Sequence, residues 1–505
     1  MELEFEREHL YNYETVLDTT LCQEETLEAI VPDACPDIQR IIDCCGQVCL
    51  TGKQAQERLA VANGLIRAAV LYQPEEGGLR KLDLSLPFSC KAECGAMTEA
   101  AELVASPRLR RIEARALNPR KVLLRVDLAV DITVCQPRER TVCTGALEAE
   151  EIGLCELCTP RETYLLTAVQ ERPFTFSEIV RIPGSGDGQL LSCRGTAVCG
   201  ESRLIGGKLI FKGSVNLRML FLNGNGELLS YQEALPFSQV MEVTDVGEDG
   251  AAELDIELTD LSWQTVEEDG RSLEVTSELL AQAMIWVKHP LTLLQDLYST
   301  QWTTQVQMED LPVVHLLDRS LRTQSIRELL ETAAPARNAV DCWLSLGEVN
   351  QQQEGEWMTA TVPLQLTVLY LDDQEQLQSV QRMTEAVCKV ECPLGAQCRI
   401  QCTWNGEMFI ALSAGGVEAR FSLDFHCRVL ELQTVAAVAQ AQTGEEQHHS
   451  GSEQPSVVLR LAAPGERLWD IAKSYGTTRK EIRLANGLES DEVPEHTMLL
   501  IPKVR

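Results

Sequence analysis

The sequence predicts a mostly β protein, with three tandem antiparallel domains of a β-sandwich or barrel-like type, followed by a small α+β module of strand–helix–helix–strand (βααβ) order. Three observations lead to this prediction: a long internal repeat, runs of alternating apolar and polar residues, and a C-terminal stretch with helical spacing between two short apolar runs. The chain of 505 residues is also too long for one core, because domains of about 150 residues are typical.

The body of the chain contains three copies of one pattern. Residues 62–93 align without gaps with residues 211–242 and 360–391, at a constant spacing of 149 residues. Because several matches recur in register and the period is too long for a solenoid, we expect three tandem domains. The best-matched positions are Leu71-Tyr72, Leu220-Phe221 and Leu369-Tyr370, together with Glu93, Glu242 and Glu391. The expected domains are residues 1–150, 151–299 and 300–435.

The local pattern in each copy is that of half-buried strands. Every second residue from Val122 to Val134 is apolar, and the same alternation recurs at residues 215–221 and 362–370. Alternation of this kind places the apolar side chains on one face of a sheet. Tight-turn pairs such as Asn223-Gly224 lie between strand candidates, as β-hairpins require.

Two short helices are expected inside this β body. Pro36 suits the first turn of a helix, which predicts one helix at residues 36–42. A second helix is expected at residues 320–332. Its apolar positions are Leu321, Ile326 and Leu330.

The stretch 436–455 breaks the β pattern. It has no periodic apolar positions and no large hydrophobic residues, so it is predicted to be a flexible linker. His448 and His449 within it could bind a metal ion, but a solvated pair of linker histidines is the favoured interpretation.

The formal charge of −32 restricts the possible partners. Residues 456–505 hold 8 basic and 7 acidic residues, a net charge of +1, so the rest of the chain carries −33. Binding to phosphate groups needs a basic surface, which argues against nucleic acid or an anionic membrane as the partner. The sequence therefore predicts a near-neutral module attached to an acidic body.

The sequence also indicates a compartment. No run of about 18 apolar residues occurs, so no membrane span is expected. The charged segment at Met1 lacks the apolar region of a secretory signal. The 19 cysteines are therefore expected to be reduced thiols in an intracellular protein.

The last 50 residues, 456–505, predict a βααβ unit. Short strands are expected at residues 457–461 and 498–501, with two helices between them. The first helix is recognised by apolar residues that recur at i, i+3, i+4 and i+7 and so share one helix face. These residues are Leu468, Ile471, Ala472 and Tyr475.

The ends of the two helices are also predicted. Gly476 is expected to end the first helix, because glycine tolerates the positive φ found there. Thr478 and Glu481 have the spacing of a capping box that opens the second helix. Ile482 and Ala485 of that second helix are expected to face inward. The expected core positions of the unit are Ile471, Tyr475, Ile482 and Ile501.

This unit resembles a LysM module from end to end. The motifs that carry the resemblance are Pro-Gly-Glu-x-Leu-Trp-x-Ile-Ala from Pro464, then Tyr-Gly, Ala-Asn-Gly-Leu and Leu-x-Ile-Pro. LysM modules bind N-acetylglucosamine polymers in a groove between the loop before the first helix and the loop after the second. The resemblance therefore implies a groove for a protein partner or a glycan, lined by Gly465, Glu466, Arg467, Leu468, Trp469, Asn486, Gly487 and Leu488.

Two positions depart from the LysM pattern. Arg467 replaces the usual Thr or Ser, which removes a helix cap worth about 1 kcal/mol and adds a charge to the groove. Glu495 stands where the family has Gly. Both departures favour a protein partner over a glycan. Trp469 is expected to be partly core, with an exposed edge that could anchor such a partner, because Trp is enriched at binding hot spots.

The segment Ile-Val-Pro-Asp-Ala-Cys-Pro-Asp-Ile-Gln-Arg-Ile, residues 30–41, resembles the opening signature of the SPOCS domain of sporulation proteins. Repeated SPOCS-type domains followed by one LysM module are similar to a SipL-like family of clostridial spore-coat assembly proteins. The resemblance implies a non-enzymatic protein of the mother-cell cytoplasm, located at the forespore surface and spore coat. It also implies docking through the LysM module onto a coat-morphogenetic ATPase, stage IV sporulation protein A.

We assign no catalytic residue, no metal ligand and no cofactor. The sequence contains no phosphate-binding loop of the Gly-x-x-x-x-Gly-Lys type, no Gly-x-Ser-x-Gly elbow and no His-Glu-x-x-His pair. Cys155 and Cys158 form an isolated Cys-x-x-Cys, whereas a four-ligand zinc site needs two more donors. For the clusters at residues 44–49 and 388–402, buried thiols are favoured over metal binding.

Three functions remain open on this evidence. The favoured one is a scaffold whose LysM module captures a protein partner and whose three domains act as a spacer or a self-association platform. The alternative is binding of peptidoglycan or a chitin-like glycan in the same groove. A cell-wall hydrolase with a LysM anchor is the least favoured, because no catalytic constellation is visible in the sequence.

Overall fold

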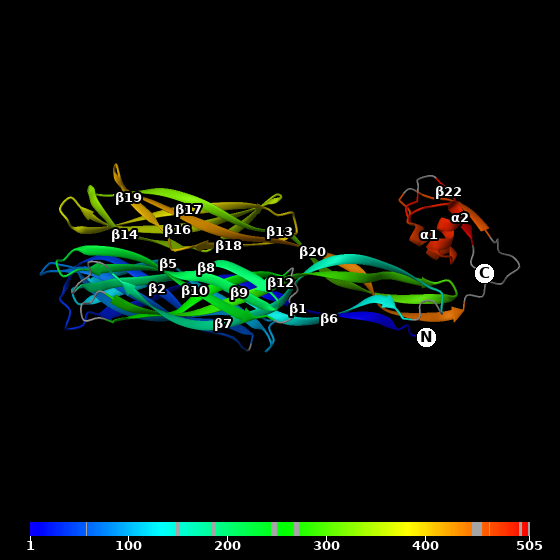
Figure 1. Ribbon diagram of the computed structural model, residues 1–505, viewed down its shortest axis with the longest axis horizontal. Coiled ribbons are helices and arrows are strands. Elements are labelled where there is room, and N and C mark those ends of the chain that lie inside the picture. Colours follow the sequence, from blue (N-terminus) through cyan, green and yellow to red (C-terminus); the bar gives the residue numbers. More distant parts are fainter. Residues whose placement is uncertain are drawn as a thin grey trace.

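The protein is an elongated molecule with three β domains at one end, three long β-ribbons that run to the other end, and a small module beside the ribbon tips (Figure 1). The N-terminus lies near that second end in the same view. The computed structural model describes residues 1–56, 58–147, 152–182, 188–243, 250–266, 272–446, 457–463, 465–493 and 497–502.

Among the described residues, the first and second domains each contain six strands. In the first domain they are β1 (Phe5–Ile30), β2 (Ile38–Gln56), β3 (Leu59–Pro74), β4 (Arg80–Glu93), β5 (Glu102–Asn118) and β6 (Lys121–Ala146). In the second domain they are β7 (Leu154–Arg181), β8 (Gln189–Ile205), β9 (Lys208–Leu222), β10 (Leu228–Glu242), β11 (Ala251–Thr265) and β12 (Ser272–Ser299).

The third domain and the C-terminal module complete the chain. The third domain contains β13 (Trp302–Glu331), β14 (Ala336–Leu346), β15 (Asn350–Glu354), β16 (Trp357–Asp372), β17 (Leu377–Glu391), β18 (Gln397–Trp404), β19 (Phe409–Ser413) and β20 (Gly416–Glu446). The module contains β21 (Val457–Leu461), α1 (Leu468–Tyr475), α2 (Arg479–Asn486) and β22 (Met498–Pro502).

All three domains have one topology. The first strand of each domain pairs with the last strand along its length, as in β1–β6, β7–β12 and β13–β20. The penultimate strand pairs with the last one, and the remaining strands form a second antiparallel sheet such as β2-β3-β4. The two sheets enclose a separate hydrophobic core in each domain. The internal repeat in the sequence is therefore a repeat in the structure.

The alternating residues lie on core-facing positions, as period two requires. In β6, Val122, Leu124, Val126 and Leu128 are all fully buried. Strands dominate the described chain, and its two helices, α1 and α2, have eight residues each. No described helix is long and apolar enough to cross a membrane. The predicted class, three antiparallel β domains followed by a small α+β module, is confirmed.

The three long ribbons pack together beyond the domains and form a shared stalk (Figure 1). Their tips are the pairs Phe5↔Ala146, Leu154↔Ser299 and Trp302↔Glu446. One buried cluster in the stalk takes residues from all three ribbons, so the stalk has its own core. This cluster contains Leu10, Val142, Leu291, Leu293, Leu311, Val313, Val435 and Ala437.

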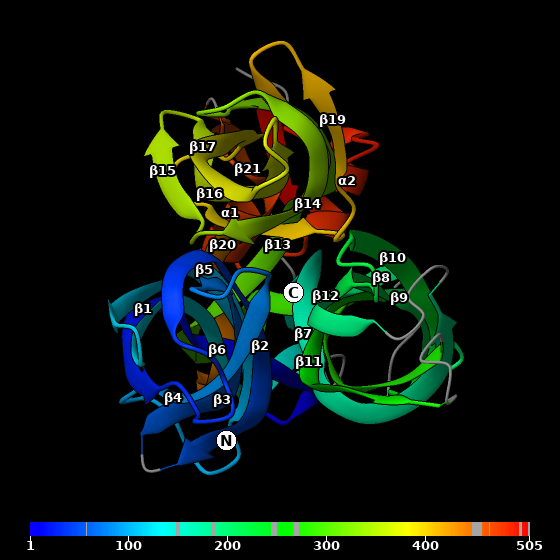
Figure 2. The ribbon, with the colours of Figure 1, turned by 90° about the vertical axis from the view of Figure 1, so that its left-hand side faces the viewer.

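The three domains surround a common axis (Figure 2). The repeated residues Leu71, Leu220 and Leu369 meet in one buried cluster that takes residues from all three domains, and each is at most 1% exposed. The 149-residue spacing is therefore visible as an approximate threefold arrangement in which each copy of one leucine packs near the others.

Polar contacts between the domains follow the same approximate symmetry. Ser230 of the second domain donates to Asp341 of the third at 3.5 Å. Its repeat-mate Ser379 in the third domain donates to Asp43 of the first at 3.1 Å. Gln47 of the first domain accepts a hydrogen bond from a backbone N–H of the second. The ring of domains is thus closed by contacts at each of its three junctions.

The Pro-Asp signature near the start of the chain forms a loop between β1 and β2. The Arg120 guanidinium donates to the carbonyls of Val31 and Cys35 at 2.9 and 2.7 Å. It also donates to the carboxylates of Asp33 and Asp37, both at 3.1 Å. Both aspartates of the signature therefore accept hydrogen bonds from the same arginine. These bonds stabilise the conformation of the loop.

The prediction of two helices inside the β body is wrong. Residues 38–42 begin β2 and pair with β3, and residues 320–331 belong to β13 and pair with β20. Ile326 and Leu330 are four residues apart, a spacing that fits a strand face as well as a helix face. Leu321 lies on the opposite face, where it is 60% exposed. Pairing with a long partner strand therefore decided the local structure.

The first part of the expected linker is a strand. Residues 436–446 continue β20 and pair with the start of β13. Ala437 and Ala441 are buried where the three ribbons approach closely, so small side chains suit a packed position here. The remainder of the expected linker, with His448 and His449, lies outside the described residues.

Candidate functional site

The C-terminal module forms the compact unit that the sequence predicted. β21 and β22 pair in antiparallel register from Val457↔Pro502 to Leu461↔Met498. Among the expected core residues, three are fully buried and Tyr475 is half-buried. The fully buried ones are Ile471, Ile482 and Ile501. Ala485, which we expected to face inward, is exposed, because α2 packs through Ile482 and leaves that side in solvent.

The helix ends carry the predicted signals. Gly476 follows α1 with a φ of 63°, in the left-handed region that glycine tolerates. Thr478 and Glu481 form a complete capping box at the start of α2. Arg467, at the N-cap of α1, makes no side-chain cap and instead pairs with Asp470 at 2.8 Å.

The residues expected to line the LysM groove are unequally available. Gly465, Arg467 and Gly487 are exposed, and Leu488 is half-buried. Leu468 is 1% exposed and belongs to the module core. The exposed positions lie in the loop before α1 and the loop after α2, where the family groove is expected.

Two polar residues of the expected groove already have structural partners. The Asn486 amide donates to the carbonyls of Ile482 and Leu500, and its oxygen accepts from the N–H of Leu500, each at 2.7 Å. Asn486 therefore ties α2 to β22. Glu466 accepts from Arg460 and from the N–H of Ala463, which fixes the loop before α1.

Trp469 lies in an interface between the module and the ribbon β7–β12. Its indole N–H donates to Asp296 at 2.8 Å, and its ring meets that of Tyr298 edge to face, with centroids 4.9 Å apart. Trp469 is only 3% exposed. The exposed edge that we expected is thus covered by the chain's own ribbon.

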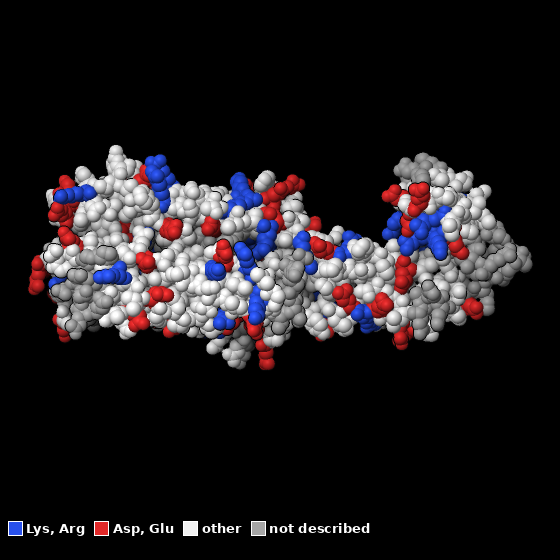
Figure 3. All heavy atoms as spheres, in the orientation of Figure 1, with Lys and Arg blue, Asp and Glu red and all other residues white. Residues whose placement is uncertain are grey.

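Other contacts extend this interface. Lys473 pairs with both oxygens of Asp296, at 2.7 and 2.8 Å. The Tyr298 hydroxyl donates to the carbonyl of Thr477 at 2.7 Å, and burial raises the pKa of Tyr298. Arg479 lies over the Trp469 ring at 5.2 Å. Lys and Arg side chains also gather on the face of the module seen in Figure 3.

Sequence reasoning did not identify Asp296 and Tyr298 as members of the candidate site. They precede Trp469 by more than 170 residues, as the hydrogen bond between Trp469 and Asp296 spans 173 positions. Neither residue belongs to a recognisable motif. Only the pairing of β12 with β7, which brings both residues to the ribbon tip, reveals their role.

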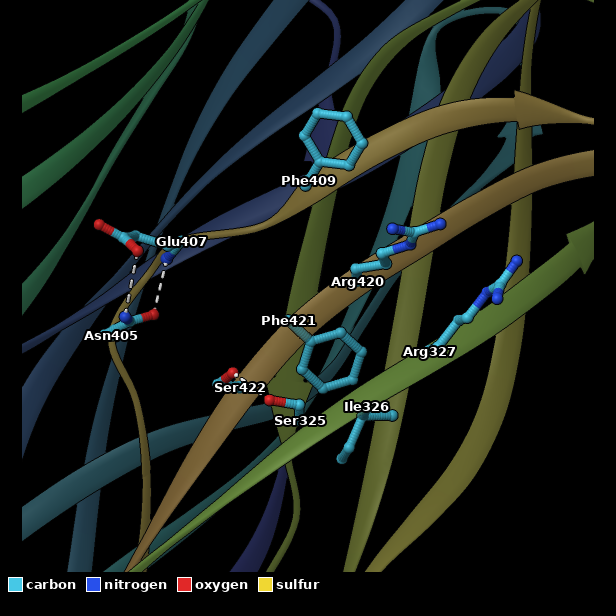
Figure 4. Close-up of a pocket in the computed structure, with 9 residues that line it drawn as sticks. All are labelled: Ser325, Ile326, Arg327, Asn405, Glu407, Phe409, Arg420, Phe421 and Ser422. Atoms are coloured by element: carbon cyan, nitrogen blue, oxygen red, sulfur yellow. Dashed lines mark hydrogen bonds between the residues drawn. The ribbon is translucent and has the colours of Figure 1, made fainter.

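A second candidate is a groove of about 400 Å³ on the third domain (Figure 4). It opens where the edge strand is interrupted between β18 and β19, so that residues 405–408 lie opposite only Phe421 and Ser422 of β20. The exposed ring of Phe409 stands at its edge. Its lining residues are Ser325, Ile326, Arg327, Asn405, Glu407, Phe409, Arg420, Phe421 and Ser422.

Most polar groups in this groove already have partners in the chain. Arg327 and Arg420 both donate to Glu418, which lowers the pKa of that carboxyl. The hydroxyls of Ser325 and Ser422 lie 3.2 Å apart. The lining contains no histidine, cysteine or lysine that could activate a serine. The described lining therefore presents no serine paired with a histidine, cysteine or lysine.

The cysteines do not form an obvious reactive site. All 19 are free thiols. Burial, reinforced by neighbouring thiols, raises the pKa of Cys398 and of Cys427 to about 12. Thiols of this kind stay protonated at neutral pH and are poor nucleophiles. Within the described residues, no group of three His, Cys, Asp or Glu side chains has metal-site geometry.

Comparison with protein families identifies two domains. A family model described as "SipL, SPOCS domain" matches residues 188–266, in the second repeat. A LysM domain model matches residues 463–502. A search of curated proteins gave no match. The first and third domains share the strand order of the second. The SPOCS plus LysM assignment is confirmed, and both are binding or scaffold domains, not enzyme families.

Proposed function

We propose that this chain, which joins a SPOCS domain to a LysM domain, is a non-enzymatic assembly protein of the spore coat or envelope. Its LysM module would dock onto a coat-morphogenetic ATPase, stage IV sporulation protein A, at the forespore surface in the mother-cell cytoplasm. The three β domains would serve as a spacer that holds the module at a fixed position.

The observation that carries this proposal is the place of the module. It is packed against the tip of the ribbon β7–β12, at the opposite end of the molecule from the three domains (Figure 1). Trp469, Lys473 and Tyr298 fix its orientation. A module held in a fixed orientation at the end of an elongated protein suits a protein that positions a partner. An anchor for an enzyme would instead need a catalytic domain.

The charge distribution supports a protein partner. The module carries a net charge of +1, whereas the remainder of the chain carries −33. Arg467 is exposed in the expected groove, where a charge suits a polypeptide surface better than a neutral sugar. An acidic body also keeps copies of the chain apart in solution.

Binding of the purified chain to the purified ATPase tests the proposal. The full chain should bind, whereas a chain that ends at residue 446 should not. Circular dichroism and a melting curve must show that the truncated chain keeps its β domains. Equal binding by the two chains would show that the partner binds the SPOCS-type domains and not the LysM module.

Glycan binding is a second candidate, favoured by the LysM match and by the exposed loops at Gly465 and Gly487. Co-sedimentation with insoluble peptidoglycan distinguishes it from the first candidate. Retention that chitin oligomers compete away would support the glycan, whereas binding to the ATPase without retention would support the protein partner.

A further inference from the structure

The three ribbons border a cavity of about 660 Å³, which we call the stalk cavity. Its lining takes residues from β1, β6, β7, β12, β13, β18 and β20. Leu10 of the lining belongs to the stalk core, and Leu17 packs against the core of the first domain, so the cavity lies where the stalk meets the domains. A cavity of this volume can hold a drug-sized molecule.

One part of the lining is aliphatic. Leu10, Val142, Leu291, Leu311 and Val313 all line the stalk cavity, and all belong to the buried cluster that forms the stalk core. Leu and Val side chains carry no group that can form a hydrogen bond. This aliphatic wall therefore suits an apolar chain and gives a polar ligand nothing to bind.

A second part of the lining is a stack of three side chains with polar ends. The rings of Tyr164 and Trp286 are stacked, with centroids 5.3 Å apart and planes within 12° of parallel. The Arg428 guanidinium carbon lies 4.1 Å from the centroid of the Trp286 ring. Tyr164, Trp286 and Arg428 are only 3%, 6% and 8% exposed, and all three line the cavity. The stack joins β7 and β12 of the second domain to β20 of the third.

Each member of this stack has a hydrogen-bond donor that no acceptor in the described part of the chain satisfies. These donors are the Tyr164 hydroxyl, the indole N–H of Trp286 and the Nε of Arg428. Arg428 uses its Nη1 for both carboxylate oxygens of Glu253, each at 2.7 Å. Burial raises the pKa of Tyr164, so the phenol keeps its proton and can donate. Unpaired buried donors are destabilising, and three of them beside one cavity indicate a ligand with an acceptor group.

The carboxylates of the lining do not supply this acceptor. Glu14 pairs with Arg140, and Asp18 lies 3.8 Å from Arg399. The lining thus combines paired acceptors with unpaired donors. A metal ion would need the reverse, because Mg²⁺ and Ca²⁺ bind oxygen acceptors.

The combination of donors and aliphatic wall restricts the ligand further. Ordered water could bond the three donors, but it would leave the aliphatic wall in contact with water. A nucleotide or another phosphate-rich ligand would have the same defect. A carboxylate on an aliphatic chain matches both parts of the lining, since hydrogen bonds from neutral and cationic donors to an anion are the strong ones.

We propose that the stalk cavity binds an aliphatic monocarboxylate. Its carboxylate accepts hydrogen bonds from Tyr164, Trp286 and Arg428, and its chain packs on the aliphatic wall. The site lies on the β domains and the stalk, so this inference goes beyond the proposed function of the LysM module and does not depend on it.

Calorimetric titration of the full-length chain with decanoate tests the ligand class. The chain is first passed over a lipid-binding resin, and native mass spectrometry confirms that no ligand remains bound. Decanoate should then bind saturably and raise the melting temperature. 1-Decanol, which has the same chain without the carboxylate, should bind about tenfold more weakly. No saturable binding of decanoate would leave water as the occupant, and equal affinity for 1-decanol would assign an apolar ligand. Either result would overturn the proposal.

Substitutions in the stack test the site itself. Tyr164→Phe deletes one unpaired donor and keeps the ring, so it should not lower the melting temperature of the ligand-free protein. It should weaken decanoate binding by about tenfold and leave the affinity for 1-decanol unchanged. Trp286→Phe should have the same effect on decanoate, with its fold checked by circular dichroism.

Tyr231→Phe is the matched control. Tyr231 lies in the second domain outside the lining, and its hydroxyl donates to Glu233 at 2.7 Å. This variant should bind decanoate with wild-type affinity. Wild-type affinity in Tyr164→Phe as well would place the ligand elsewhere on the protein and overturn the site.

Discussion

The indole N–H of Trp469 donates a hydrogen bond of 2.8 Å to the carboxylate of Asp296. This bond joins the LysM module to the tip of a ribbon from the second domain. The same carboxylate also pairs with Lys473 at 2.7 Å. One acidic side chain thus accounts for two of the polar contacts that hold the module in place.

Replacing Asp296 should release the module. Asp296→Ala removes the acceptor of Trp469 and the partner of Lys473, which should weaken docking by about 1–3 kcal/mol. Hydrogen exchange of residues 468–475 and the particle length from small-angle scattering should both increase. Asp470→Ala is the control, because Asp470 is exposed and its ion pair among the described residues is with Arg467 of the module itself. Unchanged exchange in Asp296→Ala would show that apolar packing alone holds the module.

Trp469→Glu should abolish partner capture and leave the β domains folded. The substitution buries a second carboxylate beside Asp296 and removes the ring that packs on Tyr298, so the module should leave the ribbon and lose its core. A pull-down with the ATPase measures capture. Trp357→Glu, at a 48% exposed position of the third domain, should bind normally. Retained capture by Trp469→Glu would show that the tryptophan is dispensable.

Helix caps in the module should respond in opposite directions. Thr478→Ala removes a complete capping box and should cost about 1 kcal/mol. Arg467→Ser supplies the cap that α1 lacks and should add up to about 1 kcal/mol, less the small contribution of an exposed ion pair. Hydrogen exchange of the module amides under native conditions gives both changes. A change of the same sign in the stability of both variants would contradict this explanation.

Two buried carboxyls should make stability depend on pH near neutrality. Burial raises the pKa of Asp43 to about 7 and that of Glu257 to about 8. The folded state therefore binds more protons than the unfolded state between about pH 4 and these values. The stability that these groups contribute is complete below about pH 4, near their unfolded pKa, and is lost as the pH rises through 7 and 8.

Melting curves from pH 5 to pH 8.5 should show this loss. Asp43→Asn and Glu257→Gln should each reduce the decline in melting temperature with rising pH. Asp83→Asn, at an exposed position, should not change it. Parallel curves for the wild type and Asp43→Asn would mean that Asp43 is ionised in the folded protein.

The β domains could be predicted because their apolar residues have a period that only a strand satisfies. The run Val122–Val134 leaves no alternative, since a helix would scatter those side chains around its axis. Ile326 and Leu330 gave no such discrimination, and the pairing of β13 with β20 decided their structure. The stretch 436–446 could not be predicted as a strand, because its small alanines give no apolar signal in the sequence. They are buried only because the three ribbons pack closely there.

In the candidate site, too, local features could be predicted from the sequence and long-range contacts could not. The capping box of Thr478 and Glu481 is local, so the sequence alone was sufficient to predict it. Trp469 is buried by Asp296 and Tyr298 of another domain. No local sequence pattern predicts this contact.

The cluster around Leu71, Leu220 and Leu369 joins the three repeats within one chain. Each of these leucines is at most 1% exposed, so the surface that carries them is already buried between neighbouring repeats. Contacts that three separate copies of such a domain would have to make between chains are therefore made here between covalently linked repeats, and they form at any protein concentration.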